Sequence, residues 1–206
     1  MSTEPTAPRD IREESIQAAH AVIAEQGIEA LSLRDVARRL GVSHQAPYKH
    51  FASRDHLLAE VIRRCFERFA HQLQNREPAE DPMQDLGSLG EAYLRFALDN
   101  PLEYRLMFGT PWPTSATDSA LAHDARVAFR ILQQVLATLY GKASIRDEAV
   151  ELDALFIWST MHGLATILQS NVMDRLDLRK KVLAQAAEHV MQRIGDALGT
   201  PPCRPE

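Results

Sequence analysis

The sequence predicts an all-α fold in which a small N-terminal group of helices precedes a larger helical region. Apolar residues recur at the three- and four-residue spacing of amphipathic helices, and no stretch alternates apolar and polar residues for long enough to suggest a sheet. Glycine and proline gather at a few breaks between these periodic segments. With 206 residues, 45% of them hydrophobic, the chain can bury a sizeable core, and bulk disorder is not expected.

Residues that typically cap or stop helices predict the limits of the first two helices. One is expected over residues 9–26, where Gly27 is a natural C-terminal stop. The next begins after Ser32, whose hydroxyl can cap the free N–H groups, while Asp35 can reach back to the Ser32 backbone as a weaker capping box. Its apolar stripe stops at Gly41, so this second helix is short.

A turn at residues 41–43 is expected to join the second helix to a third, very short helix over residues 44–51. Gly41 can adopt a positive φ in that turn, and Val42 can plug the crossing of the two helices from inside. Pro47 falls in the first turn of the short helix, so it is expected to remove one backbone hydrogen bond and leave the helix intact. Two short helices joined in this way form a helix-turn-helix, whose second helix can lie in the DNA major groove.

The rest of the chain is predicted to be helical as well. A long helix over residues 54–75 carries a regular apolar stripe, and a polar, proline-containing linker follows it at residues 76–82. The chain ends, residues 1–8 and 199–206, are expected to be disordered. Beyond the linker we expect helices at about 84–99, 101–109, 118–141, 146–172 and 175–198, with Pro111 and Pro113 excluding a helix between the second and third of these.

Charge is distributed unevenly along the chain. The net charge of −5 taken alone argues against a nucleic-acid partner. Between Ser32 and Arg54, however, five cations accompany a single acid, whereas thirteen cations and eighteen acids lie between Ala70 and the C-terminus. Screening confines such fields to about 10 Å at 0.1 M salt, so a locally basic element on an acidic body can still attract DNA.

Residues 12–62 resemble the signature of the TetR/AcrR family of repressors nearly end to end. The resemblance implies a helix-turn-helix DNA-binding domain at 9–53, a connecting helix at 54–75 and a regulatory, dimerising domain at 76–198. The segments 93–108 and 158–163 resemble the C-terminal domain of one subgroup of that family. The matching N-terminal marks are Leu33-Arg34-Asp35-Val36-Ala37, Leu40-Gly41-Val42-Ser43, Tyr48-Lys49-His50-Phe51 and Ser53-Arg54.

Carried over by position, the resemblance assigns DNA contacts to the turn and the short third helix. Gln45 can form two hydrogen bonds with adenine, and Lys49 can bond guanine, so both are expected base readers together with His44. Ala46 and Pro47 depart from the usual family pattern, which alters the expected base preference and leaves the binding mode intact. The complete expected set of DNA-binding residues is His44, Gln45 and Lys49 at the bases, Arg34, Tyr48, His50 and Arg54 at phosphates, and Ala46 within the same helix. Arg38 and Arg39 fit an ordinary solvated face equally well.

The predicted helix over 146–172 is apolar nearly all round, which indicates a helix buried on every face. One side is expected to pack on the core and the other on a second subunit. By resemblance, this helix and the one at 175–198 form a four-helix bundle across a two-fold axis. We therefore expect a homodimer.

Aromatic and methionine side chains concentrate in the predicted helices between residues 84 and 172, where they could line a cavity for a small apolar or aromatic effector. Ordinary core packing also accounts for any single one of them. The resemblance implies that some pocket exists. The candidate ligand-binding residues are Tyr93, Phe96, Tyr104, Met107, Phe108, Trp112, Phe129, Trp158, Met161 and His162.

Other function classes are less well supported by the residues. The chain has no glycine-rich phosphate loop, no nucleophile elbow and no helical His-x-x-x-His pair, so no catalytic residue, cofactor or metal is expected. A helical adaptor that binds only proteins would leave His44, Gln45 and Lys49 unexplained. No apolar run is long enough to cross a bilayer, and two distant cysteines suit a reducing cytoplasm.

These features predict a cytoplasmic, sequence-specific DNA-binding transcription regulator. We expect it to bind double-stranded operator DNA as a homodimer and to be a repressor that a small-molecule effector releases. Activation is also compatible with the same residues.

Overall fold

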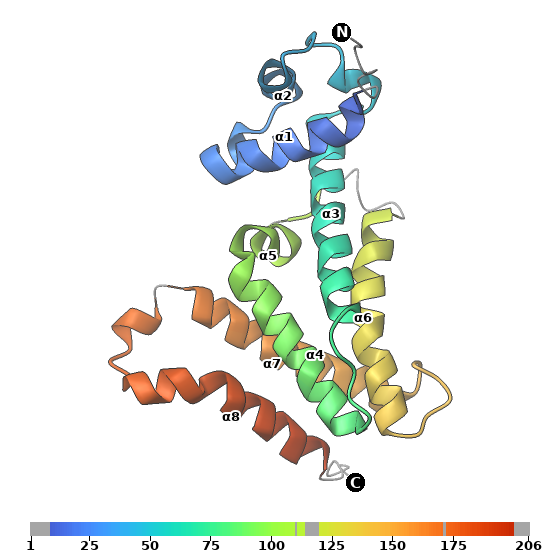
Figure 1. Ribbon diagram of the computed structural model, residues 1–206, viewed down its shortest axis with the longest axis vertical. Helices are drawn as coiled ribbons and strands as arrows, with labels where there is room; N and C mark the ends of the chain where they lie inside the picture. The colour runs from blue at the N-terminus through green and yellow to red at the C-terminus, as the bar shows by residue number, and fades with distance from the viewer. Residues whose placement is uncertain (1–8, 110, 114–119, 171, 200–206) are drawn as a thin grey trace, which may run out of the picture. The chain divides into compact units, whose positions relative to one another are not determined.

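The computed structural model describes residues 9–109, 111–113, 120–170 and 172–199 (Figure 1). Every regular element in these ranges is helical, so the all-α prediction is confirmed. No helix among them is long and apolar enough to cross a membrane. The α-helices are α1 (Ile11–Gln26), α2 (Leu33–Leu40), α3 (Arg54–Gln74), α4 (Pro82–Asp99), α5 (Pro101–Phe108), α6 (Ala120–Leu139), α7 (Glu148–Gln169) and α8 (Lys180–Leu198), and the 3₁₀ helices are η1 (Ile28–Ala30), η2 (Pro47–Lys49) and η4 (Met173–Arg175).

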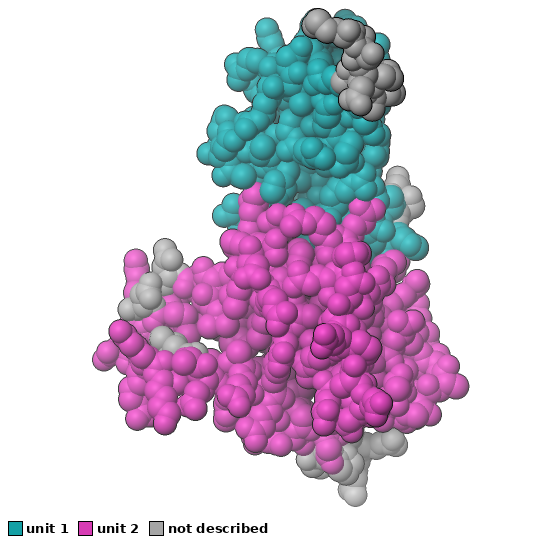
Figure 2. Space-filling view, in the orientation of Figure 1, with its two compact units in different colours: residues 1–66, 105–125 teal, residues 67–104, 126–206 magenta. Residues whose placement is uncertain are grey.

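The chain divides into two compact units (Figure 2). The first comprises residues 1–66 and 105–125, and the second comprises residues 67–104 and 126–206. The helices α3, α5 and α6 each contribute residues to both units. The functional domain limits expected from the sequence stay predictions. Of the segments expected to be disordered, 1–8 and 199–206, residues 1–8 and 200–206 lie outside the described residues.

In the first unit, α1 packs on α2, and each helix ends where the sequence predicts. Gly27 ends α1 with a φ of 87°, a conformation that favours glycine. The hydroxyl oxygen of Ser32 caps α2 by accepting a hydrogen bond from the Asp35 backbone N–H at 3.1 Å. The expected second half of the capping box is wrong, because the Asp35 carboxylate accepts from the Ser32 hydroxyl at 2.6 Å.

The turn after α2 is built around Gly41, which takes the left-handed conformation with φ 67° and ψ 30°. The Val42 backbone N–H then reaches back to the carbonyl oxygen of Ala37 at 3.1 Å. These two features satisfy carbonyl groups at the end of α2 and turn the chain sharply. The predicted positive φ at Gly41 is therefore confirmed.

The third element of the helix-turn-helix differs from the short α-helix expected over residues 44–51. A turn at residues 44–46 precedes the 3₁₀ helix η2, and its backbone bonds mostly join residues three apart, such as Ala46 to Ser43 at 2.9 Å and His50 to Pro47 at 3.0 Å, while the Phe51 N–H reaches the Pro47 carbonyl oxygen at 2.9 Å. Pro47 has no N–H to donate to Ser43, so the first α-helical bond cannot form. The tighter 3₁₀ pattern satisfies the neighbouring groups without it.

The second unit packs α7 against both α4 and α8. Along α7 the buried residues are Val150, Ala154, Ile157, Met161 and Ala165, which recur at helical spacing on one face. Met161 and Met191 approach the backbone of α4 at Gly90, where an added Cβ would meet the Met191 sulfur at 3.3 Å. The absence of a side chain at Gly90 therefore allows α7 and α8 to pack closely on α4.

Candidate DNA interface and candidate effector site

The predicted DNA-contacting side chains gather at α2 and η2 in the first unit. Arg34 is exposed in the first turn of α2, and Ala46 is half-buried beside η2. The exposed side chains in or next to η2 are His44, Gln45, Tyr48, Lys49 and His50. This stretch therefore presents a carboxamide, an ammonium group, a phenol and two imidazoles to solvent.

The exposed stretch is held from inside by Pro47 and Phe51, which are both buried. The guanidinium carbon of Arg12 lies 5.9 Å from the centre of the Phe51 ring, a cation–π contact. The imidazole of His56 meets the same ring edge-on, with ring centres 6.0 Å apart. Phe51 thus anchors the segment to α1 and α3, and the polar side chains before it face outward.

The cations of this region divide into paired and unpaired groups. Arg38 pairs with Asp35 at 2.7 Å, and Arg39 pairs with Glu25 at 2.5 Å. Arg34 and Lys49 form no ion pair with any side chain in the described ranges. The pairing of Arg38 and Arg39 fits the solvated-face reading, whereas Arg34 and Lys49 keep their full charge available for phosphates or bases.

Arg54, expected at a phosphate, has a structural role within the first unit. Its Nε donates to the carbonyl oxygen of Leu31 at 3.0 Å, and its Nη2 donates to that of Ile28 at 2.6 Å. A third nitrogen lies 3.4 Å from Asp55. The guanidinium therefore ties the first turn of α3 to the loop between α1 and α2, and a phosphate contact by Arg54 stays a prediction.

The second unit contains a chain of polar side chains from three helices. The Tyr93 hydroxyl of α4 lies 2.8 Å from that of Tyr104 on α5, and the Tyr104 hydroxyl lies 2.6 Å from Nδ1 of His162 on α7. The Tyr93 hydroxyl is itself 3.4 Å from the same nitrogen. Both tyrosines are buried and His162 is half-buried. A buried hydrogen-bond network of this kind fixes the relative positions of the helices that supply it.

Aromatic rings surround this polar chain. Tyr104 stacks on His162 with ring centres 5.4 Å apart, and Trp158 lies 5.9 Å from His162 on the same helix. Phe129 meets Trp158 edge-on at 5.9 Å. Near Tyr93 the rings of Phe69 and Phe96 complete the cluster, at 5.4 Å from Tyr93 to Phe69 and 5.0 Å from Phe69 to Phe96.

Burial sets the protonation states of the polar chain. It raises the pKa of Tyr93, and a hydrogen bond from Trp158 opposes this rise. Burial also raises the pKa of Tyr104 to about 12 and lowers the pKa of His162. Each shift favours the uncharged form of its group. At pH 7 the cluster therefore consists of two phenols and a neutral imidazole.

The lowered pKa of His162 makes the stability of the protein depend on pH. An imidazole in the unfolded chain titrates near 6.5, so below about that pH the unfolded state binds the proton more readily than the folded state. This contribution to the free energy of unfolding is complete above about 6.5 and is lost as the pH falls through the lowered pKa. We expect the melting temperature to fall between about pH 7 and about pH 5.

The variant His162→Asn tests this dependence, because its amide oxygen can still accept a hydrogen bond from Tyr104 but cannot titrate. Its melting temperature should fall less than that of the wild type over the same pH range. His44→Asn, at an exposed position, serves as the control and should follow the wild type. Parallel pH profiles for His162→Asn and the wild type would contradict the assignment.

The structure distributes the expected ligand-binding residues between both units. Tyr93, Phe96, Phe129, Trp158, Met161 and His162 lie in the second unit with Tyr104, whereas Met107, Phe108 and Trp112 lie in the first. There the Trp112 indole donates to the Met107 carbonyl oxygen at 3.0 Å, and Phe66 meets the rings of Phe108 and Trp112 edge-on at 5.6 Å and 5.7 Å. These contacts give the three residues of the first unit a packing role.

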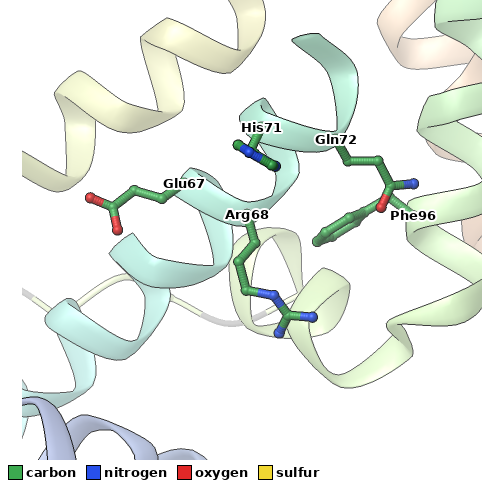
Figure 3. Close-up of a pocket in the computed structure, with 5 residues that line it drawn as sticks. All are labelled: Glu67, Arg68, His71, Gln72 and Phe96. Atoms are coloured by element: carbon green, nitrogen blue, oxygen red, sulfur yellow. The ribbon is translucent and has the colours of Figure 1, made fainter. Parts of the chain in front are cut away.

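A surface cleft of about 410 Å³ lies in the second unit between α3 and α4 (Figure 3). Phe96 forms part of its wall, and the other lining residues are Glu67, Arg68, His71 and Gln72, with Glu67 extending away from Phe96. Of these, only Phe96 was expected from the sequence. The signal that could have indicated the cleft is the spacing of the four polar residues, which puts them on one side of α3.

Polar groups along the cleft are already bonded within the unit. Arg68 donates to Glu103 at 2.8 Å and to the side-chain oxygen of Asn100 at 3.1 Å. Gln72 donates to the carbonyl oxygen of Ala92 at 3.2 Å. The cleft wall therefore cross-links α3 to α4 and α5, and its polar side chains stabilise that packing.

Two family profiles together match most of the chain. Residues 16–61 match the profile of bacterial regulatory proteins of the tetR family. Residues 86–194, more than half of the chain, match the tetracyclin repressor-like C-terminal domain. The two matches correspond to the helix-turn-helix and to the region that holds the polar chain.

Curated relatives carry regulator names. The chain is 26% identical over 192 residues to the HTH-type transcriptional repressor KstR of Rhodococcus jostii strain RHA1, covering 86% of this chain and 84% of that protein. It is 30% identical over 95 residues to the HTH-type transcriptional repressor Rv3405c of Mycobacterium tuberculosis, covering 46% of this chain and 50% of that protein. The chain thus spans about half the length of the first curated relatives that it matches.

Solved structures share the fold over nearly the whole chain. The regulatory protein SCO4313 superposes with a TM-score of 0.71 at 26% identity, covering 94% of this chain and 100% of that one. A protein of unknown function from Rhodococcus sp. RHA1 superposes with a TM-score of 0.72 at 25% identity, covering 95% and 96% of the two chains.

Proposed function

This chain belongs to the TetR family of bacterial transcriptional regulators, and on that premise we propose that it is a repressor released from its operator by a small molecule. Regulators of this family bind operator DNA and act as dimers. Repression is favoured because the relatives KstR and Rv3405c are named as repressors. The observation that carries the DNA-binding part is the cluster of exposed donors around η2.

We assign base contacts and phosphate contacts to different residues according to how exposed each side chain is and whether it forms an ion pair. The Gln45 carboxamide can donate to N7 of adenine and accept from its N6 amino group, Lys49 can donate to guanine, and His44 lies beside them. Arg34, Tyr48 and His50 surround this group and are proposed to hold phosphates, which set register and affinity. Arg38 and Arg39 are left out of the proposal because each already pairs with an acid.

Selection of bound DNA from a random pool tests the proposal directly. The selected sequences should contain an inverted repeat whose half-sites are related by whole helical turns, because a two-fold symmetric dimer presents two identical recognition segments. Recovery of unrelated sequences, with the same affinity for all of them, would contradict sequence-specific binding.

Substitution of a proposed base reader should change specificity as well as affinity. Gln45→Ala is expected to weaken operator binding by about 1–3 kcal/mol and to relax the preference at one base pair in each half-site. Titrations on the operator and on random DNA measure both effects. Arg38→Ala is the matched control, since Arg38 is exposed and pairs with Asp35. Equal losses on operator and random DNA for Gln45→Ala would contradict a base-reading role.

The proposed release by a ligand requires coupling between the second unit and the DNA-binding segment. The helix α3 runs without interruption from Arg54 in the first unit to Gln74 in the second, so it provides a continuous route for such coupling. A coupling free energy of about 1–3 kcal/mol would lower operator affinity roughly 5–150-fold. Calorimetry of a ligand with and without operator must give the same factor, because binding linkage is reciprocal.

A further inference from the structure

Charged side chains in the first unit form a connected series of ion pairs. The Arg12 guanidinium on α1 donates to the Glu60 carboxylate on α3 at 2.6 Å. Arg63, one turn further along α3, donates to the same carboxylate at 3.2 Å and to the Asp124 carboxylate on α6 at 3.2 Å. This series of Arg12, Glu60, Arg63 and Asp124, which we call the ion-pair chain, links α1, α3 and α6.

Most of the ion-pair chain is shielded from water. The side chains of Glu60, Arg63 and Asp124 are 13%, 18% and 19% exposed, whereas that of Arg12 is 40% exposed. Burial raises the pKa of Glu60, but the hydrogen bonds and charges of Arg63 and Arg12 outweigh this effect and hold the pKa below its usual value. Glu60 is therefore ionised at pH 7, and its attraction for Arg12 is screened less than that of an exposed pair.

One end of the ion-pair chain contacts the residue that holds the proposed DNA-contacting segment, residues 44–50. The guanidinium carbon of Arg12 lies 5.9 Å from the centre of the Phe51 ring. Phe51 is 1% exposed and directly follows His50, and its backbone N–H donates to the Pro47 carbonyl oxygen at 2.9 Å. Because so short a segment has little helical stability of its own, tertiary contacts such as that of Arg12 set its position.

The other end of the ion-pair chain lies on α6, outside the helix-turn-helix. Asp124 belongs to the first unit, and α6 continues from it into the second unit, where Phe129 contacts Trp158 with ring centres 5.9 Å apart. Three ion pairs and one cation–π contact therefore join α6 to Phe51.

We infer that Arg12 is a positioning residue for the DNA-contacting segment and that the rest of the ion-pair chain holds Arg12 in place. In this role Arg12 acts through Phe51 and not through a contact of its own with DNA. The inference rests on the proposed base contacts around η2 and is independent of release by a ligand. It predicts that the acids Glu60 and Asp124 support specific binding. Electrostatics alone predicts the opposite, because an acid in a DNA-binding unit repels phosphates.

The ratio of two DNA affinities separates positioning from stability. One affinity is for the operator obtained by selection from the random pool, and the other is for random DNA of the same length at the same salt concentration. Loss of folded protein lowers both affinities by the same factor and leaves the ratio unchanged. Misplaced base-reading side chains lower the operator affinity more, because random DNA is held mainly through its phosphates. A lower ratio in a variant that melts as a folded protein therefore reports a positioning role.

Arg12→Met keeps the aliphatic stem of the side chain but removes the charge that contacts Phe51 and Glu60. Its ratio of operator to random-DNA affinity should fall roughly tenfold. Arg12→Lys restores a cation at the Phe51 ring, so its ratio should stay within about threefold of the wild-type value. Glu13→Gln is the matched control, because it removes a different ion pair between α1 and α3, to Arg64 at 2.8 Å. Its ratio should equal that of the wild type, and an unchanged ratio in Arg12→Met would overturn the inference.

Asp124→Ala tests the far end of the ion-pair chain and keeps the test decisive if Arg12→Met does not fold. Its ratio should be lower than the wild-type ratio by roughly threefold, the size of one partly exposed ion pair. The double variant Arg12→Met/Asp124→Ala should have the ratio of Arg12→Met alone, because both changes act through the same contact with Phe51. A wild-type ratio in Asp124→Ala, or losses that multiply in the double variant, would overturn the inference.

The wild-type protein distinguishes failure of this inference from failure of the proposed function. Equal wild-type affinity for selected and random DNA would contradict sequence-specific binding itself. A wild-type protein that discriminates between the two DNAs, together with undiminished discrimination in Arg12→Met, refutes only the positioning role of Arg12.

Discussion

Phe156→Glu is expected to separate the dimer into monomers and to lower operator affinity roughly 10²–10⁴-fold. Each monomer would then bind a half-site alone, without the effective concentration that a joined partner provides. The physical reason lies in α7, which has two apolar faces on opposite sides. One face packs in the core, and the other carries large exposed apolar side chains at Leu152, Leu155, Phe156 and Ile167, each 43% to 60% exposed.

An apolar face of this size on a helix that also packs on the core is typical of a surface between subunits. A carboxylate at Phe156 would lie among apolar partners with no compensating charge, which association could not tolerate. Sedimentation at micromolar concentration measures the subunit state, and titration measures operator affinity. Leu98→Glu, at an exposed apolar residue of α4 in the same unit, is the control and should stay dimeric. A dimeric Phe156→Glu protein would place the interface elsewhere.

Arg54→Met is expected to lower the free energy of unfolding by about 2 kcal/mol, because it removes two hydrogen bonds from a charged donor to the carbonyl groups of Ile28 and Leu31. For a chain of this size the melting temperature should fall by roughly 4–8 °C. Operator and random DNA should both be bound more weakly, since the loop between α1 and α2 loses its support. The structural role by itself leaves the salt dependence of binding unchanged, because it involves no phosphate.

Arg54→Lys distinguishes this structural role from a phosphate contact. Lysine keeps the charge but cannot direct two fixed donors at two carbonyl groups. The Arg54→Lys protein should therefore be destabilised nearly as much as the Arg54→Met protein. Arg38→Met removes an exposed cation of the same region and should leave the melting temperature almost unchanged. A normal melting temperature for Arg54→Met, combined with a reduced salt slope that Arg54→Lys restores, would establish the phosphate contact.

The sequence by itself determined the helical class and the helix ends of the first unit. Gly41 takes the positive φ predicted for it, Gly27 ends α1 as predicted, and Ser32 caps α2. These features are local, since each depends on one residue and on backbone groups only a few positions away. The apolar period of α3 was predicted for the same reason, because periodicity reports directly which face is buried.

The 3₁₀ conformation of η2 could not be predicted from the spacing of residues along the sequence. The sequence correctly located Pro47 in the first turn, but an eight-residue segment that loses a backbone bond has little intrinsic helical stability. Contacts of the buried residues Pro47 and Phe51 decide its conformation, and these contacts involve side chains from distant parts of the chain such as Arg12. Tertiary packing therefore selected the tighter 3₁₀ form.

The sequence also could not identify hydrogen-bond partners that lie far apart along the chain. The family resemblance assigned Arg54 a phosphate contact, which stays a prediction, but it could not show that carbonyl groups 23 and 26 residues away accept hydrogen bonds from this side chain. The ten candidate ligand residues were selected only by the type of their side chains, so the sequence could not show that they divide between two units. The fold alone brings Tyr93 and Tyr104 to His162, 69 and 58 residues further along the chain, because hydrogen bonds between helices depend on how those helices pack.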